Sequence, residues 1–231
     1  MSPTEKALRI QALKAKHTFA IQWYSLVIAI GLVAVTFAVA KDVPYQHRTT
    51  GALSAFYLSS VGTQPWLINQ VFPFAMALSV SRNAFVRATM LIIAVEALVA
   101  GVGLTVLSRL ESATHGWFVH MRLLNMPYIH QDNAFTQFLV YGVPMAVVST
   151  MMAFIAAVFR AFGQIGLWVF AVGLAVVAVA IIMVLTLTHS ADGILHFFGS
   201  QPMLADLALY PLALVVLFGT GWALLMKRAR V

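Results

Sequence analysis

The sequence predicts an all-α, polytopic membrane protein with six transmembrane helices, an N-terminal amphipathic helix at the membrane interface, and both termini in the cytoplasm. Of its 231 residues, 61% are hydrophobic and only 9% are charged, whereas a soluble domain carries about 25% charged residues. Two uncharged stretches, 134–157 and 165–187, exceed the roughly 20 apolar residues that span a bilayer as a helix. Neither stretch alternates as a membrane β-strand would.

The hydrophobic pattern indicates one transmembrane domain that covers residues 1–231, since no linker or internal repeat divides the chain. The second span contains Pro65 and Pro73, so we expect it to be tilted or kinked. The longest polar connection, 108–133, contains aromatic residues and is expected to lie partly on the membrane surface. The six spans are predicted at about 23–40, 52–78, 88–107, 134–157, 165–187 and 205–226.

The segment 3–20 is predicted to form an interfacial connecting helix on the cytoplasmic leaflet. Ser2 can cap this helix, Pro3 suits its first turn, and Glu5 completes a capping box. Its basic residues and its apolar residues fall mainly on different faces. The alternative is that the segment is only a basic flank of the first span.

The distribution of basic residues predicts the orientation in the membrane. Ten of the 14 Lys and Arg residues fall on the side of the termini, and four fall in the opposite loops: Lys41, Arg48, Arg109 and Arg122. Because cytoplasmic loops are enriched in Lys and Arg, we expect cytoplasmic termini and a bacterial inner membrane location. The same bias accounts for the net charge of +7 without a nucleic-acid partner.

The sequence contains no recognisable catalytic or cofactor motif. It has no cysteine, no G-x-x-x-x-G-K-[ST] phosphate loop, no H-E-x-x-H and no G-x-S-x-G. We therefore expect no enzymatic activity, no cofactor and no metal site in this chain. Six of the seven histidines fall in the predicted outer loops, and we interpret them as scattered polar residues: His47, His115, His120, His130, His189 and His196.

Glu96 is the one acidic residue deep inside a predicted span, near the middle of the third, since Asp206 lies at the edge of the sixth. A carboxylate at that depth is costly and is a candidate functional residue. It shares a helical stripe with the small residues Ala100 and Gly103, which would let another helix approach closely. Glu96 is therefore expected to face protein or a water-filled path. It is interpreted either as a contact for cargo or a proton, or as a hydrogen-bonded packing residue.

The segment 80–87, a short basic turn with Phe85 among arginines, could contact a cytoplasmic partner or could simply reflect the positive-inside rule. With the residues before it, 72–85 resembles a recurrent segment of the membrane subunits of type-2 ATP-binding cassette (ABC) exporters. In that family a span ends in Phe-Pro and a Gly-x-Ser-Arg-Arg-x-Phe-like turn follows. The acidic-then-Gly-Trp pattern in 110–117 and the turn at 160–163 resemble the family as well. The sequence has Ser79, Asn83 and Ala88 where glycine, arginine and glycine are usual.

The resemblance implies a permease subunit that couples to a separate cytoplasmic ABC ATPase subunit, in which ATP and Mg²⁺ are bound. A second permease subunit, identical or paralogous, would pair with it in the lipid bilayer, with the translocation path between them. Glu96 would lie in or near that path. The outer gate would include Glu111, Gly116 and Trp117. The coupling residues implied are Ser81, Arg82, Asn83, Phe85 and Arg87 in the first cytoplasmic turn, and Arg160 in the second.

Two other functions stay open at this point. An ion-gradient-driven secondary transporter would need ionisable residues at mid-membrane and repeat symmetry, and Glu96 is the one candidate for the former. The other is a membrane assembly or sensing subunit that transports nothing itself. The presence of an ATPase partner separates the exporter from both.

Overall fold

The computed structural model describes residues 2–39, 43–44, 48–188 and 190–228, and most of these are helical. Four helices are long and apolar enough to cross a membrane: 3–39, 82–113, 134–187 and 205–227. The all-α class and the membrane character are thus confirmed, while the number of crossings and the location of the termini stay predictions. The elements are α1 (Pro3–Val39), α2 (Leu53–Ser59), α3 (Thr63–Ala77), α4 (Arg82–Ala113), η2 (Gly116–His120), α5 (Ala134–Leu187), α6 (Ala191–Ser200), η3 (Ala205–Leu209) and α7 (Tyr210–Arg228).

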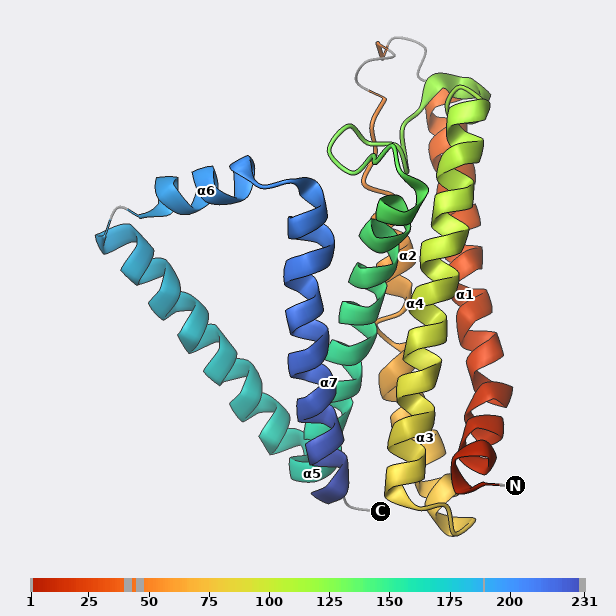
Figure 1. The fold of residues 1–231 in the computed structure, drawn as a ribbon, viewed down its shortest axis with the longest axis vertical. Coiled ribbons are helices and arrows are strands. Elements are labelled where there is room, and N and C mark those ends of the chain that lie inside the picture. Colours follow the sequence, from red (N-terminus) through yellow and green to blue (C-terminus); the bar gives the residue numbers. More distant parts are fainter. Residues whose placement is uncertain (1, 40–42, 45–47, 189, 229–231) are drawn as a thin grey trace.

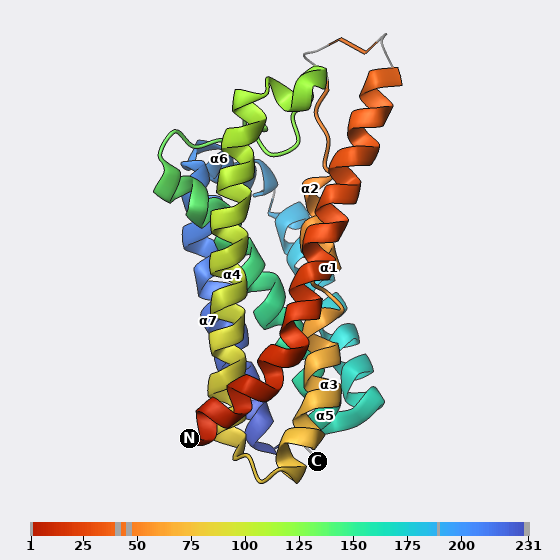
Figure 2. The same ribbon diagram turned by 90° about the vertical axis from the view of Figure 1, so that its right-hand side faces the viewer.

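The long helices run between two ends of the molecule (Figure 1). At one end, which we call the terminal end, α1 begins, α7 finishes, α3 turns into α4, and α5 is broken. The opposite end, which we call the loop end, holds the residues around 48–52, the connection 114–133 and α6. Figure 2 shows the same division after a quarter turn.

One helix, α1, takes the place of the predicted interfacial helix and the first span. Its start is confirmed, since the Glu5 N–H donates to Ser2 Oγ over 3.2 Å. The separation expected between 20 and 23 is wrong, because α1 continues through these residues for 37 residues in all. Ala7 and Gln11 are fully buried, so one face of the first turns packs against the bundle, and the interfacial position of this segment stays a prediction.

The predicted second span consists of two helices, because the chain turns at Ser60–Gly62 between α2 and α3. The break lies just ahead of Pro65, whose ring and missing N–H disfavour helix on its N-terminal side. Ser60 Oγ donates to the Tyr57 carbonyl over 2.6 Å, which satisfies one backbone group at the break. Pro73 lies inside α3, so the first proline coincides with the interruption and the second is accommodated.

The helix α5 contains both the fourth and the fifth predicted spans. Its 54 residues would extend about 80 Å if straight, against a hydrocarbon core of about 30 Å. Gly163 breaks it with φ 71° and ψ −165°, a conformation open essentially only to glycine. The first half (134–162) leads to the terminal end, and the second half (164–187) returns from it (Figure 1). The predicted turn at 160–164 is thus reduced to one residue.

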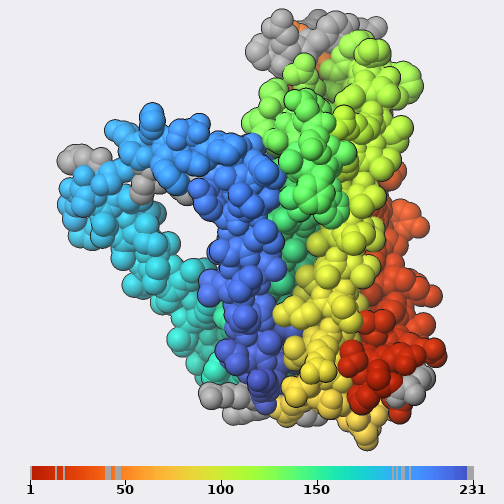
Figure 3. Space-filling view, in the orientation of Figure 1, coloured from red at the N-terminus to blue at the C-terminus, as the bar shows by residue number. Residues whose placement is uncertain are grey.

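The predicted polar loop 188–204 contains a further helix, α6, which connects the second half of α5 to η3 and α7 across the loop end (Figure 1). In the space-filling view, the second half of α5 stands away from α7, with an opening between them (Figure 3). Its most apolar window has no buried residue. This half of α5 therefore has less protein around it than the other long helices have.

Two apolar clusters fill the bundle. The cluster toward the terminal end includes Phe72, Phe85 and Trp222, and the rings of the two phenylalanines lie 5.1 Å apart, edge to face. The cluster toward the loop end includes Phe56 and Tyr141. Inside a membrane, close packing of this kind holds helices together, because lipid tails are as apolar as the side chains.

The helices α4 and α5 contact each other through two glycines. A Cβ on Gly142 would lie 3.0 Å from the Ala97 carbonyl oxygen and 3.5 Å from Gly101 Cα. A Cβ on Gly101 would lie 2.7 Å from the ring of Phe138. Small residues therefore let the two backbones approach, as they commonly do between membrane helices.

Gly142→Val should push α4 away from α5 and destabilise the folded chain by about 1–3 kcal/mol. The matched control is Gly173→Val, because no atom beyond the backbone of its own helix turn lies within 4 Å of the place where a Cβ on Gly173 would be. Thermal unfolding of both variants in detergent measures the difference. If Gly142→Val melted at the temperature of the control, the close contact of α4 and α5 would be refuted.

Candidate functional site

The carboxylate of Glu96, in the middle of α4, is the polar centre of the bundle and is only 2% exposed. Gln22 Nε2 donates to its Oε1 over 2.5 Å. Its Oε2 accepts from Gln64 Nε2 at 3.0 Å and from Ser149 Oγ at 2.9 Å. These donors belong to α1, α3 and α5, so one carboxylate links four helices. The expectation that Glu96 faces protein is confirmed.

Helical spacing brings these groups together. On α1, Gln11 and Gln22 are eleven residues, or about three turns, apart and lie on one face, and both are buried. On α4, Thr89 lies two turns before Glu96, and its hydroxyl donates to Gln11 Oε1 over 3.1 Å. The contact between α1 and α4 thus contains two successive polar links within apolar surroundings.

The Glu96 site is closed in this structure, because Gln22, Gln64 and Ser149 are each 2% exposed or less. Solvent therefore does not reach the Glu96 carboxylate in this conformation. The three donors complement an ionised carboxylate, which accepts hydrogen bonds and donates none. Among the described residues, Gln64 Oε1 is buried beside this site without a hydrogen-bond partner.

The predicted coupling segment forms the turn between α3 and α4. Ser79 has a φ of 60°, the left-handed conformation that favours glycine. Ser81 Oγ accepts from the backbone N–H three residues further on, over 3.3 Å, and so caps α4. Arg82, Asn83 and Arg87 then belong to the first two turns of α4. The coupling residues that the resemblance implies in this segment thus lie in the turn and in the first two turns of α4.

Exposure divides the residues of this segment. Asn83 and Arg87 are exposed, while Arg82 is half-buried and donates to the Lys227 carbonyl over 2.7 Å, which ties α4 to the end of α7. Phe85 is fully buried. A ring without exposed surface cannot contact a partner in this conformation, so the expectation that gave Phe85 a partner contact is corrected. Phe85 is a core side chain here.

Arg160, the residue expected in the second cytoplasmic contact, lies in α5 just before the break. It is half-buried, and its Nη2 donates to the Asn69 carbonyl. Its guanidinium also lies 5.9 Å from the centre of the Phe72 ring, a cation–π distance. Arg160 therefore contacts α3 of its own chain, near the turn that carries Arg82.

The predicted outer-gate residues come together at the loop end. Glu111 is 2% exposed and accepts from the backbone N–H groups of residues 123–125 at 2.9–3.2 Å. It also accepts from Trp117 Nε1 at 3.0 Å. A buried charge needs such hydrogen bonding, and converging backbone N–H groups are a common way to supply it. Glu111 thereby fastens the outer connection to the end of α4.

The backbone between Glu111 and these partners is strained. Left-handed φ values cost residues other than glycine about 1–3 kcal/mol each. A Cβ on Gly116 would lie 2.3 Å from the carbonyl oxygen of residue 121, so only glycine fits there. Arg48 Nη1 donates to the Val119 carbonyl over 2.8 Å, which holds the segment from outside. Four residues other than glycine have φ between 50° and 64° here: His115, Trp117, Phe118 and His120.

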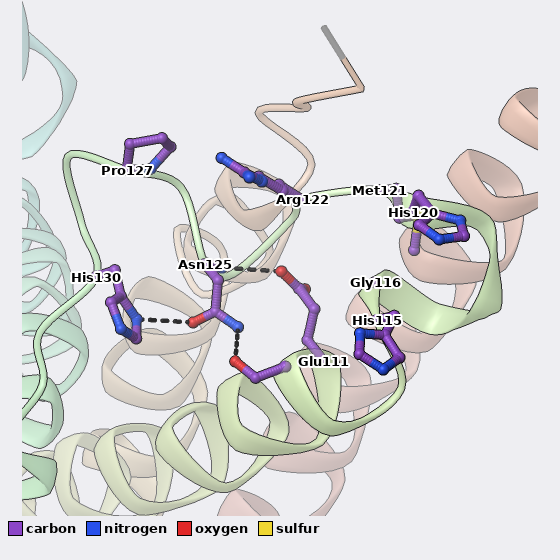
Figure 4. A pocket seen from close by; sticks show the side chains of 10 residues that line it. Glu111, His115, Gly116, His120, Met121, Arg122, Asn125, Pro127 and His130 are labelled. Atoms are coloured by element: carbon purple, nitrogen blue, oxygen red, sulfur yellow. Dashed lines mark hydrogen bonds between the residues drawn. The ribbon is translucent and has the colours of Figure 1, made fainter. Parts of the chain in front are cut away.

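A pocket of about 520 Å³ opens beside Glu111. In Figure 4, His115 and His130 lie on opposite sides of it, with Glu111 and Asn125 between them. Asn125 Oδ1 lies 3.1 Å from His130 Nδ1 and accepts from Ser108 Oγ over 2.5 Å. The pocket is thus built from the 108–133 segment, with polar side chains and apolar surface both in its lining.

This pocket corrects one part of the sequence interpretation. Three of the histidines are gathered instead of scattered, since His115, His120 and His130 all line the pocket. His196 lies in α6, and His47 and His189 lie outside the described residues. Within the described ranges, no group of three His, Asp or Glu residues is arranged to hold a metal ion.

Sequence reasoning missed the partners of both buried carboxylates. Gln22, Gln64 and Ser149 are uncharged polar residues within or beside apolar runs, and nothing in their spacing indicates which helices meet. One signal was available, because a polar side chain within a membrane span has to find an internal partner. Applied to Gln64 and Ser149, which lie in the second and fourth predicted spans, this rule predicts that both side chains face protein.

The chain matches no family model, no curated protein and no solved structure. Its function is therefore argued from the chemistry of three places. The closed Glu96 site can bind a proton or hold four helices together. The exposed basic residues at the terminal end can bind an acidic or polar protein surface, and the pocket at the loop end can receive a polar group.

Glu111→Gln keeps the size of the side chain but removes its charge and one acceptor oxygen. We expect the outer connection to open more often, because hydrogen bonds to a charged group contribute about 1.5–3 kcal/mol each. Hydrogen exchange of the amides of residues 123–125 should accelerate at least about tenfold. Glu5→Gln, at an exposed glutamate, is the control. Unchanged protection in Glu111→Gln would mean that other contacts hold this connection.

Proposed function

We propose that this chain is a permease subunit of an ATP-driven ABC exporter in the bacterial inner membrane. It forms half of a translocation path and hydrolyses no nucleotide itself. ATP and Mg²⁺ are bound by a separate cytoplasmic ATPase subunit, and a second permease subunit, identical or paralogous, completes the path. The observation that carries this proposal is the turn from Leu78 to Ser81, followed by the basic first turns of α4.

Conformation and charge of this turn both support the proposal. Ser79 adopts the left-handed conformation that the glycine of the resembled motif favours, so the substitution does not prevent the turn. Asn83 and Arg87 are exposed directly after it. The exposed side chains of Lys6 and Lys227 belong to the same end of the molecule. An ATPase subunit with an acidic or polar groove would find a complementary surface at this end.

The path of the chain supports six crossings with both termini on the cytoplasmic side. Six segments run between the two ends: α1, α2 with α3, α4, the two halves of α5, and α7. With the terminal end in the cytoplasm, the basic residues described at the loop end are Arg48, Arg109 and Arg122. Most basic residues then lie inside, as the positive-inside rule requires.

The second half of α5 supports pairing with another membrane subunit. Between the two halves of α5 and α7 lies a groove of about 810 Å³, lined almost entirely by apolar side chains that include Phe154, Phe162 and Phe170. Each exposed face of such a helix has to be covered by lipid or by another helix. In the proposal, a second permease subunit covers part of this surface, and the bilayer covers the rest.

One observation favours a second candidate function, an ion-gradient-driven transporter. Such proteins carry ionisable residues between helices at mid-membrane, and Glu96 lies in such a place. The candidates differ in their partners, because only the exporter requires an ATPase subunit. A non-transporting assembly or sensing subunit would have neither a coupled ATPase activity nor ion-driven uptake.

Affinity purification of the chain from its native host, followed by mass spectrometry, tests the proposal. We expect a stoichiometric partner with a G-x-x-x-x-G-K-[ST] phosphate loop. The complex in lipid should hydrolyse ATP faster than the partner alone. A folded, dimeric preparation without such a partner would reject the exporter and favour the ion-driven transporter.

Charge reversal at the turn should uncouple the two subunits. Arg87→Glu should lower the permease-dependent ATPase activity at least about tenfold, because the new glutamate would repel an acidic partner surface, and like charges that face each other across an interface cost several kcal/mol. Arg82→Glu should have the same effect and also remove a hydrogen bond to α7. The control is Arg109→Glu, an exposed arginine toward the loop end. Full ATPase activity in both Arg87→Glu and Arg82→Glu would show that the ATPase subunit does not bind at this turn.

A further inference from the structure

We propose that Glu96 is a reversible proton-binding site inside the membrane, with Gln64 as a partner that serves both the ionised and the protonated carboxyl group. Two independent observations carry the proposal. Three donors converge on the Glu96 oxygens, and the remaining amide oxygen of Gln64 is buried beside them without a partner in the described part of the chain. The proposal holds whichever energy source drives transport.

The observed arrangement suits the ionised form of Glu96. Both carboxylate oxygens accept from side chains of other helices, at 2.5–3.0 Å. A charged group at this depth is tolerated only when it is hydrogen-bonded in this way. The orientation of the Gln64 amide, with Nε2 toward Glu96, belongs to this state, because Oε1 in the same place would face an acceptor.

The protonated form needs an acceptor where the ionised form needs a donor, since a carboxylic acid carries one O–H group. Rotation of the Gln64 amide about its last side-chain bond exchanges Nε2 and Oε1. Oε1 then takes the place of Nε2 and accepts the proton of Glu96. This rotation breaks no hydrogen bond to Oε1, because Oε1 has no hydrogen-bond partner in the observed structure. The link between α3 and α4 is kept in both states.

A proton fits this site better than a metal ion does. Hard cations need several oxygen ligands at about 2.0–2.6 Å and the space to hold them. Here Gln22, Gln64 and Ser149 already fill the positions around the carboxylate and exclude solvent. Protonation requires only the turn of one amide, with no enlargement of the site.

No other charged group interferes with Glu96 from the helices around it. The groups that face it from α1, α3 and α5 are Gln22, Gln64 and Ser149. None of these side chains ionises at ordinary pH. On α4, Arg87 and Glu111 lie nine and fifteen residues away, or about 13 and 22 Å along the axis. Lys227 of α7 lies at the terminal end. None of the hydrogen bonds of Glu96 given above involves the other titratable residues described on α1, α2, α4, α5, η3 and α7: Glu5, Lys6, Arg9, Lys16, His17, Tyr24, Tyr57, Arg82, Arg109, Tyr141, Arg160, Asp206 and Tyr210.

Infrared spectroscopy of the full-length chain in lipid nanodiscs tests the proposal directly, because a protonated carboxyl group absorbs apart from a carboxylate. The titration runs from about pH 4 to pH 10, which covers the range of buried carboxyl groups. Exposed carboxyl groups also protonate at the acid end of this range, so the Glu96 band is identified as the carboxyl band that is absent from Glu96→Gln and persists in Glu111→Gln. We expect this band to appear as the pH falls. A Glu96 band that stays constant over the whole range, or never appears, would overturn the proposal.

Matched variants test the double role of Gln64. Gln22→Met removes a donor to the ionised form only, so the midpoint of the carboxyl titration should rise by about one to two pH units. Gln64→Met removes a donor to the ionised form and an acceptor to the protonated form. The midpoint of the carboxyl titration in this variant should therefore move by less than half as much as in Gln22→Met. Gln22→Leu replaces Gln22→Met if that variant fails to fold. A shift in Gln64→Met as large as in the donor variants would refute the double role.

Discussion

In lipid, every buried polar group has to be satisfied by the protein itself, and Glu96 imposes this constraint on four helices at once. Its carboxylate requires Gln22, Gln64 and Ser149 to be within hydrogen-bond distance, which sets how α1, α3 and α5 lie against α4. The two apolar clusters pack on either side of this contact along α4. Close packing stabilises the bundle, but apolar side chains alone would leave the register of the helices less defined.

The two buried carboxylates of α4 solve the same problem in different ways. Glu96 is surrounded by side chains from three other helices, and these can rotate. Glu111 is held mainly by backbone N–H groups of residues 123–125, which cannot rotate without unfolding the connection. The first arrangement can adapt to a change of protonation, while the second is a fixed anchor. The strained backbone of η2 depends on that anchor and on Arg48.

Periodicity and composition predicted the elements of the fold better than their ends. Long apolar runs are independent of tertiary context, so the helices and the break at Gly163 were approximately foreseen. The continuity of α1 was not, because a basic helix on a membrane and the first turns of a packed helix look alike in sequence. For the site, Glu96 was found because a lone acid in a span is conspicuous. Its partners and the burial of Phe85 depend on which helix faces meet, and one sequence does not contain that information.

The helix α4 runs unbroken for 32 residues, about 48 Å. Its first residues follow the turn at Ser79, its middle carries Glu96, and its last turn carries Glu111. A helix of this length without proline behaves as a stiff rod over small displacements. The three places therefore lie on one rigid element. A displacement of the exposed residues at the start of α4 would shift the buried carboxylate and the outer pocket as well.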